Sequence, residues 1–329
     1  MRSSISINAD EAQRLCSLHA YEALGETLCD LAEEIPSLSV IVADYGRRLS
    51  LERLRKEHPE DYLQAGIAEQ DQVSIAAALA LEGFCTFVPS YASFITSRAF
   101  DQVRVLMGAM GAPIMLIGLS AGYDSGTLGA THMSTEDISL MRSVSGVTVL
   151  SPSDNAELAA MLRWLATNPM PAYLRITGAD EKNCLHTSGL PQGATDIEQL
   201  RPGTDVAIIA TGQLCAAALD AADILADKGI SASVTNIAVI EPLDTNALEK
   251  IVANATLVVT VEEHSTRGGL GSALTEFLVT RKTPTPFMAL GTPRIPPAAD
   301  TRPMLLHRIG LDAKGIATHI LSRLNHEGS

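Results

Sequence analysis

The chain has 329 residues, and 24 lysines and arginines against 38 aspartates and glutamates give it a formal charge of −14 at pH 7. Hydrophobic residues make up 46% of it and charged residues 19%, a globular composition that excludes an intrinsically disordered chain. The length suggests two domains of roughly 150 residues each. The negative charge disfavours binding to nucleic-acid backbones, so an anionic ligand would need a local group of cations or backbone N–H donors.

The cysteines and the apolar stretches bear on the cellular compartment. No C-x-x-C pair occurs, so we expect no zinc site, no other metal centre and no disulfide framework. The cysteines are predicted to be small buried hydrophobes. No apolar leader segment is present, and the longest apolar stretches are far shorter than the roughly 18 residues of a membrane span. A soluble, cytoplasmic protein without membrane contact is expected. The five cysteines are Cys16, Cys29, Cys85, Cys184 and Cys215.

Short β-branched runs alternate with helical patterns along most of the chain, which predicts βαβ units and a doubly wound α/β fold. In the first half, residues 40–44, 114–119 and 147–150 are expected to be buried strands. Glu69–Leu81 is apolar on nearly every side and is predicted to be a buried helix. A further helix over residues 156–167 is expected to have Ser153 or Asp154 as its N-cap.

The texture of the sequence changes after Arg175. Residues 178–204 are polar and without periodicity, which predicts an interdomain linker between a first domain (1–190) and a second domain (200–329). The second domain is expected to have strands at 206–210, 232–237 and 257–261 and a helix over 214–227. The turn at Thr211-Gly212 resembles a phosphate-binding turn, but a tight βα turn needs glycine for backbone reasons alone, and we favour that interpretation.

The most informative motif is Gln64-Ala-Gly-Ile-Ala-Glu-Gln70, which leads into the predicted buried helix. A carboxylate at the mouth of an apolar helix is costly without a partner, because desolvation disfavours its charged form. Glu69 could therefore share a proton with a nitrogen heterocycle. Alternatively it caps its own helix, and the local pattern does not decide between the two roles.

Two further stretches carry candidate site residues. Tyr91, Phe94 and Phe100 lie close together although only 4% of the chain is aromatic, so they could form a stacking platform for a planar ring. Core packing is the alternative, and the segment alone favours it. A glycine-rich loop after the strand at 114–119 carries His132, and such loops bind ligands at the carboxyl ends of parallel strands. A histidine there can donate to a substrate oxygen or exchange a proton.

In this order the motifs resemble the thiamine-diphosphate-dependent transketolases. The matching stretches are Gly66-Ile-Ala-Glu-Gln70, Phe94-Ile-Thr-Ser-Arg-Ala-Phe-Asp-Gln-Val-Arg104, Gly129-Ala-Thr-His132, Glu136-Asp-Ile-Ser-Leu-Met-Arg142 and Val149-Leu-Ser-Pro-Ser-Asp154. Val259-Thr-Val-Glu-Glu-His264 and Gly268-Gly-Leu-Gly-Ser272 resemble the C-terminal domain of that family. The resemblance spans nearly the whole chain and implies a pyrimidine-binding domain followed by a transketolase C-terminal domain.

The resemblance covers only the second part of a full-length transketolase. In that family an N-terminal domain holds the diphosphate and Mg²⁺ through a Gly-Asp-Gly…Asn motif, and no Gly-Asp-Gly occurs in this sequence. The chain therefore resembles the C-terminal subunit of a split transketolase. This implies thiamine diphosphate and Mg²⁺ as cofactors, held mainly by an N-terminal transketolase-like partner subunit, in a heterotetramer of two chains of each kind.

The resemblance also assigns cofactor-binding roles. Glu69 matches the glutamate that hydrogen-bonds N1′ of the aminopyrimidine and activates the cofactor. Phe94 matches the phenylalanine that stacks on the pyrimidine, and Tyr91 matches an aromatic position lining the same pocket. Asp44 matches an acidic residue near the cofactor, and Ser97 is expected to belong to the same cofactor-binding group.

Substrate-binding roles follow in the same way. His132 matches the active-site histidine near the reacting carbon, and Arg175 matches an arginine that binds the substrate phosphate. Arg48 could substitute for a phosphate-binding arginine expected in the first helix. Leu128 stands where transketolases usually carry an aspartate that reads a donor hydroxyl, and Ser120 stands at an upstream histidine position. These departures imply a modified or branched ketose donor.

The function expected from the resemblance is transfer of a two-carbon ketol unit from a ketose, phosphorylated or otherwise anionic, to an aldose. One alternative is the β subunit of the first component of a 2-oxoacid dehydrogenase, although residues 131–142 favour a transketolase. A deoxyxylulose phosphate synthase is disfavoured because that enzyme is normally one long chain. A non-catalytic scaffold subunit is a further alternative, against which the joint presence of Glu69, Phe94 and His132 argues.

Overall fold

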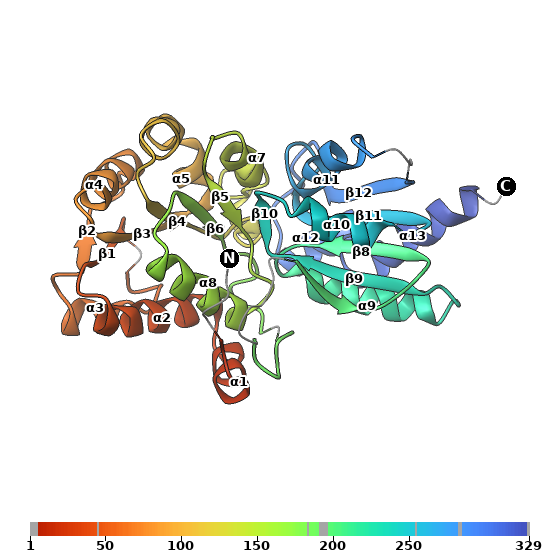
Figure 1. The fold of residues 1–329 in the computed structure, drawn as a ribbon, viewed down its shortest axis with the longest axis horizontal. Coiled ribbons are helices and arrows are strands. Elements are labelled where there is room, and N and C mark those ends of the chain that lie inside the picture. Colours follow the sequence, from red (N-terminus) through yellow and green to blue (C-terminus); the bar gives the residue numbers. More distant parts are fainter. Residues whose placement is uncertain are drawn as a thin grey trace.

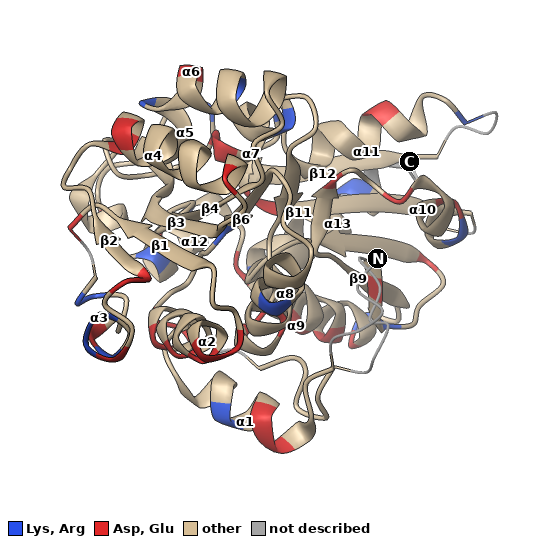
Figure 2. Cartoon of the chain, turned by 60° about the vertical axis from the view of Figure 1, so that its left-hand side comes forward, with Lys and Arg blue, Asp and Glu red and all other residues tan. Residues whose placement is uncertain are grey.

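Two α/β domains lie side by side in the computed structural model, with the first domain on the left and the second on the right of Figure 1. The structure describes residues 6–327 except 45, 183, 191–196, 254 and 282–284. Within that part of the chain, no helix is both long enough and apolar enough to cross a membrane. Acidic positions recur along the helices at residues 9–17 and 20–34, consistent with the net negative charge (Figure 2).

The first domain is built on a seven-stranded sheet in the order β10-β5-β6-β4-β3-β1-β2, parallel except at β10. Its strands are β1 (Leu38–Val42), β2 (Tyr62–Gln64), β3 (Cys85–Tyr91), β4 (Ile114–Leu119), β5 (Thr148–Leu150), β6 (Ala172–Arg175) and β10 (Val239–Glu241). Its helices are α1 (Ala9–Ser17), α2 (Ala20–Glu34), α3 (Glu52–Glu57), α4 (Glu69–Leu81), α5 (Ala92–Ser97), α6 (Phe100–Gln102), η1 (Val103–Ala109), η2 (Gly126–Leu128), α7 (Asp137–Arg142) and α8 (Asn155–Thr167). Helices α2 and α8 cover one face of the sheet, and α4, η1 and α7 cover the other.

The second domain has a five-stranded sheet in the order β12-β11-β8-β9-β7, parallel except at β7. Its strands are β7 (Ile197–Arg201), β8 (Val206–Ala210), β9 (Ala232–Ile237), β11 (Leu257–Ser265) and β12 (Phe287–Thr292). Its helices are α9 (Leu214–Ala226), α10 (Thr245–Val252), α11 (Leu270–Leu278), α12 (Arg302–Ile309) and α13 (Ala313–Glu327). Apolar residues of α9 and α13 pack on one face, and α10 and α11 pack on the other. The predicted fold class, two doubly wound α/β domains, is confirmed.

Most predicted elements agree with the structure, but the strand predicted at 40–44 is observed as β1 (Leu38–Val42), and the linker also differs. Helix α4 and strands β4, β8 and β9 have the expected bounds, and Asp154 is the N-cap of α8 because its carboxylate accepts the N–H of Glu157. Gly212 has a φ of +63°, a backbone conformation that favours glycine. The geometry of the turn is therefore sufficient to explain the glycine without a bound phosphate. The expected linker is wrong at residues 197–201, which form β7 and pair with β9. Residues 183 and 191–196 of that linker lie outside the described residues.

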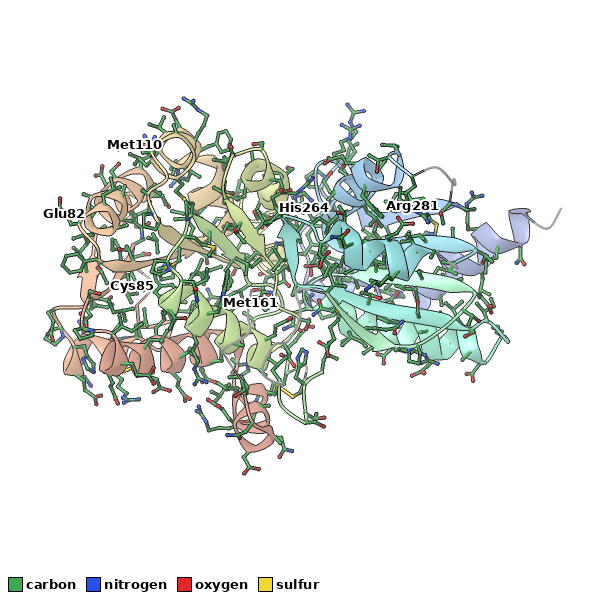
Figure 3. The ribbon with its side chains drawn as sticks, in the orientation of Figure 1. Glu82, Cys85, Met110, Met161, His264 and Arg281 are labelled. Atoms are coloured by element: carbon green, nitrogen blue, oxygen red, sulfur yellow. A yellow bond between two sulfur atoms is a disulfide. The ribbon has the colours of Figure 1, made fainter. Side chains whose placement is uncertain are left out.

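The prediction that no disulfide forms is wrong for two of the cysteines. Cys16 on α1 and Cys184 in the interdomain segment (residues 176–190) form a disulfide, with Cα atoms 5.3 Å apart and a sequence separation of 168. The sulfur–sulfur bond lies beside α1 in Figure 3. The remaining cysteines are buried free thiols, as expected, and burial raises the pKa of Cys85 to about 12.

His186 ties the interdomain segment to both domains. Its Nδ1 lies 2.9 Å from Asp154 Oδ2 at the start of α8, and its Nε2 lies 2.8 Å from Glu198 Oε2 in β7. Burial alone would lower the pKa of His186, but the hydrogen bonds to the two carboxylates outweigh it and raise the pKa to about 10. The imidazole is therefore a cation between two anions at neutral pH.

A second junction lies where β6 meets the second domain. Arg175 is 2% exposed, and its Nε and Nη2 donate to the two carboxylate oxygens of Asp137 at 2.8 and 3.2 Å. Its Nη2 also donates to the carbonyl oxygen of Glu263 in β11 at 3.2 Å. The Glu263 carboxylate in turn accepts from Arg302 of α12, with Nη2 2.6 Å from Oε2. Opposite charges thus alternate through the domain interface.

Replacing His186 should make stability depend on pH in a defined direction. Because the folded pKa is raised from 6.5 to about 10, the stabilisation is complete below pH 6.5 and is lost as the pH rises through 10. We expect His186→Gln to lower the free energy of unfolding by roughly 2–3 kcal/mol at pH 6 and by much less near pH 10. Urea denaturation of both proteins at several pH values measures this, and an equal loss at pH 6 and pH 10 would contradict it.

Breaking the buried pair at the domain interface should be far more damaging than breaking an exposed one. We expect Arg175→Met to cost about 3–5 kcal/mol, since Asp137 is left buried without its cation. Adding Asp137→Leu should recover most of that loss. The control is Arg104→Met, which breaks an exposed pair with Asp101 and should cost less than about 1 kcal/mol. Denaturant unfolding of the four proteins is the measurement, and similar losses for both arginines would refute the expectation.

Candidate functional site

The carboxyl ends of neighbouring parallel strands β1, β3 and β4 converge on one edge of the first sheet. Asp44 follows β1, Tyr91 ends β3 and Ser120 follows β4. In open α/β sheets this edge is where ligands bind. Helix α4 begins beside it, so the sequence motifs that are far apart in the chain meet in one region.

Glu69 is the first residue of α4 and is only 3% exposed. Its Oε2 accepts a hydrogen bond of 2.8 Å from Nη1 of Arg98, which follows α5. The N-cap of α4 is Ala68, and no side chain caps the helix. The alternative that Glu69 caps its own helix is therefore wrong; its carboxylate faces a cation instead.

Three aromatic rings form the centre of the site. The Tyr91 and Phe94 ring centroids are 5.7 Å apart, and the His132 ring lies 5.6 Å from Tyr91 and 5.3 Å from Phe94, each pair edge to face. Such geometry is favourable for aromatic pairs and leaves ring faces available for stacking. Phe100 lies apart in α6 and packs against the core, as the alternative interpretation predicted for it.

The loop that carries His132 is held closed at its base and supported by the second domain. Gly122 and Ser134 exchange two backbone hydrogen bonds, of 2.7 and 2.9 Å. Gly122 has a φ of +65°, and a Cβ there would lie 2.6 Å from Oε1 of Glu263, so only glycine fits. The same Oε1 accepts the N–H of Tyr123 at 2.8 Å. The position of His132 therefore depends on the domain interface.

A polar group adjoins the aromatic rings. The hydroxyls of Tyr21 and Ser120 are 2.7 Å apart, and the Arg48 guanidinium lies over the Tyr21 ring at 5.6 Å. Nη1 of Arg48 donates to the Tyr91 hydroxyl at 3.4 Å. Burial raises the pKa of Tyr21 well above its usual value, so this hydroxyl stays protonated. Ser120 has a φ of +51°, which is a strained backbone for serine and is common at functional sites.

The other predicted site residues lie at the rim. Asp44 and Ser97 are exposed, and the Ser97 hydroxyl donates to the carbonyl of Ser93 one turn earlier. Leu128 ends the short 3₁₀ turn η2 and is 54% exposed. The structure thus places Ser120 with the buried polar group and leaves Leu128 facing solvent.

The prediction for Arg175 does not agree with the structure. Its guanidinium is buried at the domain interface, where Nε and Nη2 donate to Asp137 and Nη2 also donates to the carbonyl of Glu263. A phosphate could reach it only by breaking a buried ion pair, so its role here is structural. Sequence similarity could not reveal this, because the partner carboxylate lies 38 positions away in the chain.

Two members of the site were not predicted. Arg98 contacts both Glu69 and Phe94, and the available signal was its spacing four residues after Phe94, which brings the two side chains to one helical side. Tyr21 gave no signal, because its partners Ser120 and Arg48 are distant in sequence. Asp124, a partly buried residue of the loop that carries His132, accepts the N–H of Ala179 at 3.1 Å, and desolvation raises its pKa to about 6.

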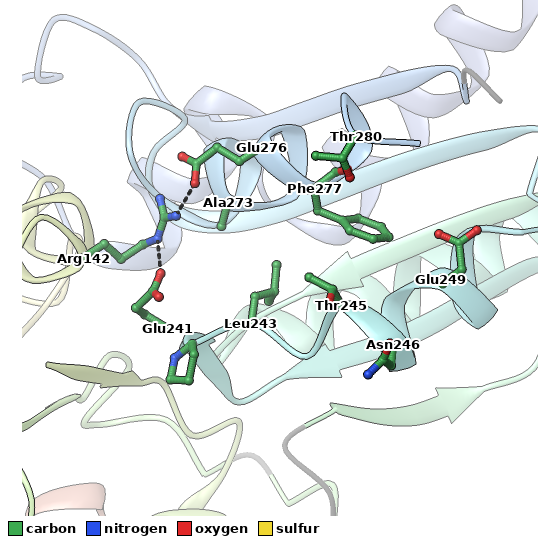
Figure 4. Close-up of a pocket in the computed structure, with 11 residues that line it drawn as sticks. Arg142, Glu241, Leu243, Thr245, Asn246, Glu249, Ala273, Glu276, Phe277 and Thr280 are labelled. Atoms are coloured by element: carbon green, nitrogen blue, oxygen red, sulfur yellow. Dashed lines mark hydrogen bonds and ion pairs between the residues drawn. The ribbon is translucent and has the colours of Figure 1, made fainter. Parts of the chain in front are cut away.

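An open cavity of about 550 Å³ lies elsewhere, between α10 and α11 of the second domain (Figure 4). Arg142 at its edge is engaged by Glu241 and Glu276, at 3.4 and 2.9 Å. None of the residues predicted for the site lines this cavity. The clustered aromatic, carboxylate and cationic side chains of the first domain are therefore the better candidate for chemistry.

Comparisons with known proteins identify both domains. Residues 17–179 match the family model of the transketolase pyrimidine-binding domain, and residues 195–316 match that of the transketolase C-terminal domain. One relative, a subunit of an apulose-4-phosphate transketolase from Phocaeicola vulgatus, is 32% identical over 88% of this chain and 93% of its own length. Another, a subunit of a 6-deoxy-6-sulfo-D-fructose transketolase from a Clostridium species, is also 32% identical, over 88% of this chain and 90% of its own length.

Solved structures give the same result. A split-gene transketolase, described as an inactive β4 tetramer, superposes with a TM-score of 0.79 at 31% identity and covers 94% of this chain and 98% of that chain. A full-length transketolase from Campylobacter jejuni, 18% identical, shares the fold with a TM-score of 0.74 over 46% of its length. The chain belongs to the transketolase family and carries its pyrimidine-binding and C-terminal domains.

Proposed function

We propose that this chain is the C-terminal subunit of a two-subunit, thiamine-diphosphate-dependent transketolase that moves a two-carbon ketol unit from a ketose to an aldose. The observation that carries the proposal is the convergence of Glu69, Tyr91, Phe94 and His132 on one sheet edge. The relatives described as subunits of split transketolases support it. The convergence also argues against a scaffold subunit, since a non-catalytic chain has no need to keep a buried carboxylate beside a cluster of aromatic rings.

The residues present suit an aminopyrimidine. Such a ring needs a carboxyl group at one ring nitrogen and an aromatic face to stack on, and Glu69 and Phe94 supply these groups within reach of one cation, Arg98. When bound, thiamine diphosphate supplies the nucleophilic carbon that attacks the ketose carbonyl. Glu69 holds a proton at the pyrimidine nitrogen, Phe94 and Tyr91 fix the ring, and Ser97 and Asp44 border the entrance.

His132 and Arg48 serve the substrate. His132 contacts the rings of Tyr91 and Phe94 edge to face, which places it beside the proposed cofactor site. There its ring nitrogens can donate hydrogen bonds to oxygens of the sugar or accept hydrogen bonds from its hydroxyls. Arg48 lies at the same mouth and would bind an anionic end group. The relatives named for apulose 4-phosphate and for a sulfonated fructose support a phosphorylated or sulfonated donor. Leu128 and Ser120 favour a donor that differs from the usual sugar phosphates.

The partner would be an N-terminal transketolase-like subunit that holds the diphosphate and Mg²⁺, in a heterotetramer of two chains of each kind. No Gly-Asp-Gly occurs in this chain, which supports a division of cofactor binding between two polypeptides. The related β4 tetramer is described as inactive, which agrees with a need for the second subunit. We place the complex in the cytoplasm, where sugar phosphates are made and consumed.

Glu69→Gln should abolish most of the activity while the complex still assembles. With the partner subunit present, we expect the turnover number to fall by roughly 10²–10⁴-fold, since glutamine cannot exchange a proton with the ring nitrogen. The matched control is Glu82→Gln, an exposed carboxylate at the opposite end of α4, labelled in Figure 3, which should keep full activity. Ketose-plus-aldose turnover is the assay, and full activity of the Glu69 variant would falsify the proposed mechanism.

The same assay distinguishes the alternative enzyme. A β subunit of a 2-oxoacid dehydrogenase would support decarboxylation of a 2-oxoacid and no ketol transfer. We expect ketol transfer without decarboxylation. If the complex decarboxylates a 2-oxoacid, transfers no ketol unit and still requires Glu69, the assignment of the cofactor site would stand and the proposed reaction would be wrong.

A further inference from the structure

We propose that Arg98 is a positioning residue, which fixes the Glu69 carboxylate and the Phe94 ring relative to one another so that both meet the pyrimidine correctly. This inference rests on the proposed function. Neither the resemblance nor the comparisons assign Arg98 a role. It contacts both of the residues proposed to bind the pyrimidine, and it does so with one planar group.

The helical turn at α5 produces this geometry. Phe94 lies within α5, and Arg98 follows one turn later, where its backbone N–H donates to the Phe94 carbonyl at 2.9 Å. Residues four apart on a helix face the same side, so the guanidinium folds back over the ring, with Cζ 4.5 Å from the centroid. From that position Nη1 reaches Oε2 of Glu69 on another helix, at 2.8 Å. One side chain thus joins α4 to α5.

The contact matters because Glu69 is buried. Its side chain is 3% exposed, and among the described residues Arg98 is its only hydrogen-bonding partner. Arg98 binds Oε2, so the other oxygen is the one that can meet a ring nitrogen. Without the guanidinium, the carboxylate could rotate about its last torsion, which is a soft, two-fold torsion. Arg98 therefore sets the direction of the carboxylate as well as compensating its charge.

A guanidinium suits this task better than an ammonium. It is planar, so it can stack on Phe94 while its N–H groups point sideways at a carboxylate, whereas an ammonium is a compact, strongly hydrated charge. The stacking fixes the arginine before any ligand arrives, so little further ordering is needed. Lysine at this position should keep the positive charge but should no longer fix the orientation of the Glu69 carboxylate.

Arg98 differs in this respect from an ordinary surface ion pair. Its own side chain is 50% exposed, but the carboxylate that it binds is not. Arg104, six residues later, also pairs with a carboxylate, that of Asp101, yet both partners are exposed, at 59% and 74%. Exposed pairs of this kind contribute little. Arg104 is therefore a matched control from the same part of the chain.

The test uses the complex of this chain with its partner subunit and measures thiamine diphosphate binding by calorimetry, together with the near-ultraviolet circular dichroism of the bound pyrimidine. We expect Arg98→Gln to weaken cofactor binding at least 10-fold and to reduce the dichroic signal at saturating cofactor. Arg98→Lys should restore part of the affinity and little of the signal. Arg104→Gln should match the wild type in both measurements.

A double-mutant cycle shows whether Arg98 acts through Glu69. In the Glu69→Gln background, adding Arg98→Gln should change cofactor affinity by less than about 3-fold, because the carboxylate to be positioned is gone. Tighter binding by Arg98→Gln, wild-type binding and dichroism, or an equal loss in both backgrounds would overturn the inference. These outcomes are separate from the proposed function, which fails if Glu69→Gln alone keeps full ketol transfer or if the wild-type complex decarboxylates 2-oxoacids without ketol transfer.

Discussion

The alternating charges buried between the two domains control the geometry on which the site depends. Asp137, Arg175, Glu263 and Arg302 are each at most 6% exposed, and each has an oppositely charged neighbour or a carbonyl dipole. Buried ion pairs add little stability by themselves, because desolvation offsets the attraction, but each member is costly to leave unpaired. The interface therefore has one strongly preferred arrangement. That arrangement decides where Glu263 lies.

Glu263 connects the domain interface to the loop that carries His132. One carboxylate holds Arg302 and also accepts the N–H of Tyr123, at the base of the loop that ends in His132. Strand β10 adds a second connection, since Val239–Glu241 from the second half of the chain completes the sheet of the first domain. The C-terminal domain is thus part of the support of a site whose side chains all come from the first domain. A change at the interface should therefore alter catalysis by moving His132.

Local patterns in the sequence were sufficient for the elements and for the residues that meet at the sheet edge. Helix α4, strand β4 and the loop with His132 are each encoded within short stretches by apolar spacing and glycine placement, so they could be predicted, whereas strands β2 and β3 on either side of α4 were not. Contacts between distant positions could not. The Cys16–Cys184 disulfide, the Arg175–Asp137 pair and the pairing of β7 with β9 all join segments whose proximity is set by tertiary packing. Similarity to a family even misled at Arg175, because a guanidinium that could bind phosphate serves a carboxylate equally well.

Two arginines at the mouth of the site show how an acidic chain can present cations to an anionic ligand. Arg48 lies over the Tyr21 ring and Arg98 over the Phe94 ring, so aromatic stacking fixes each guanidinium in place. Stacking on a ring face leaves the N–H groups in the plane of the guanidinium available for hydrogen bonds. Arg98 directs them to the buried Glu69, and Arg48 directs one to the Tyr91 hydroxyl. The first arrangement holds the cation against a buried carboxylate, and the second places a cation beside the Tyr91 hydroxyl. An anionic ligand of a chain with a net charge of −14 needs cations nearby, and aromatic rings hold two such cations, Arg48 and Arg98, in place.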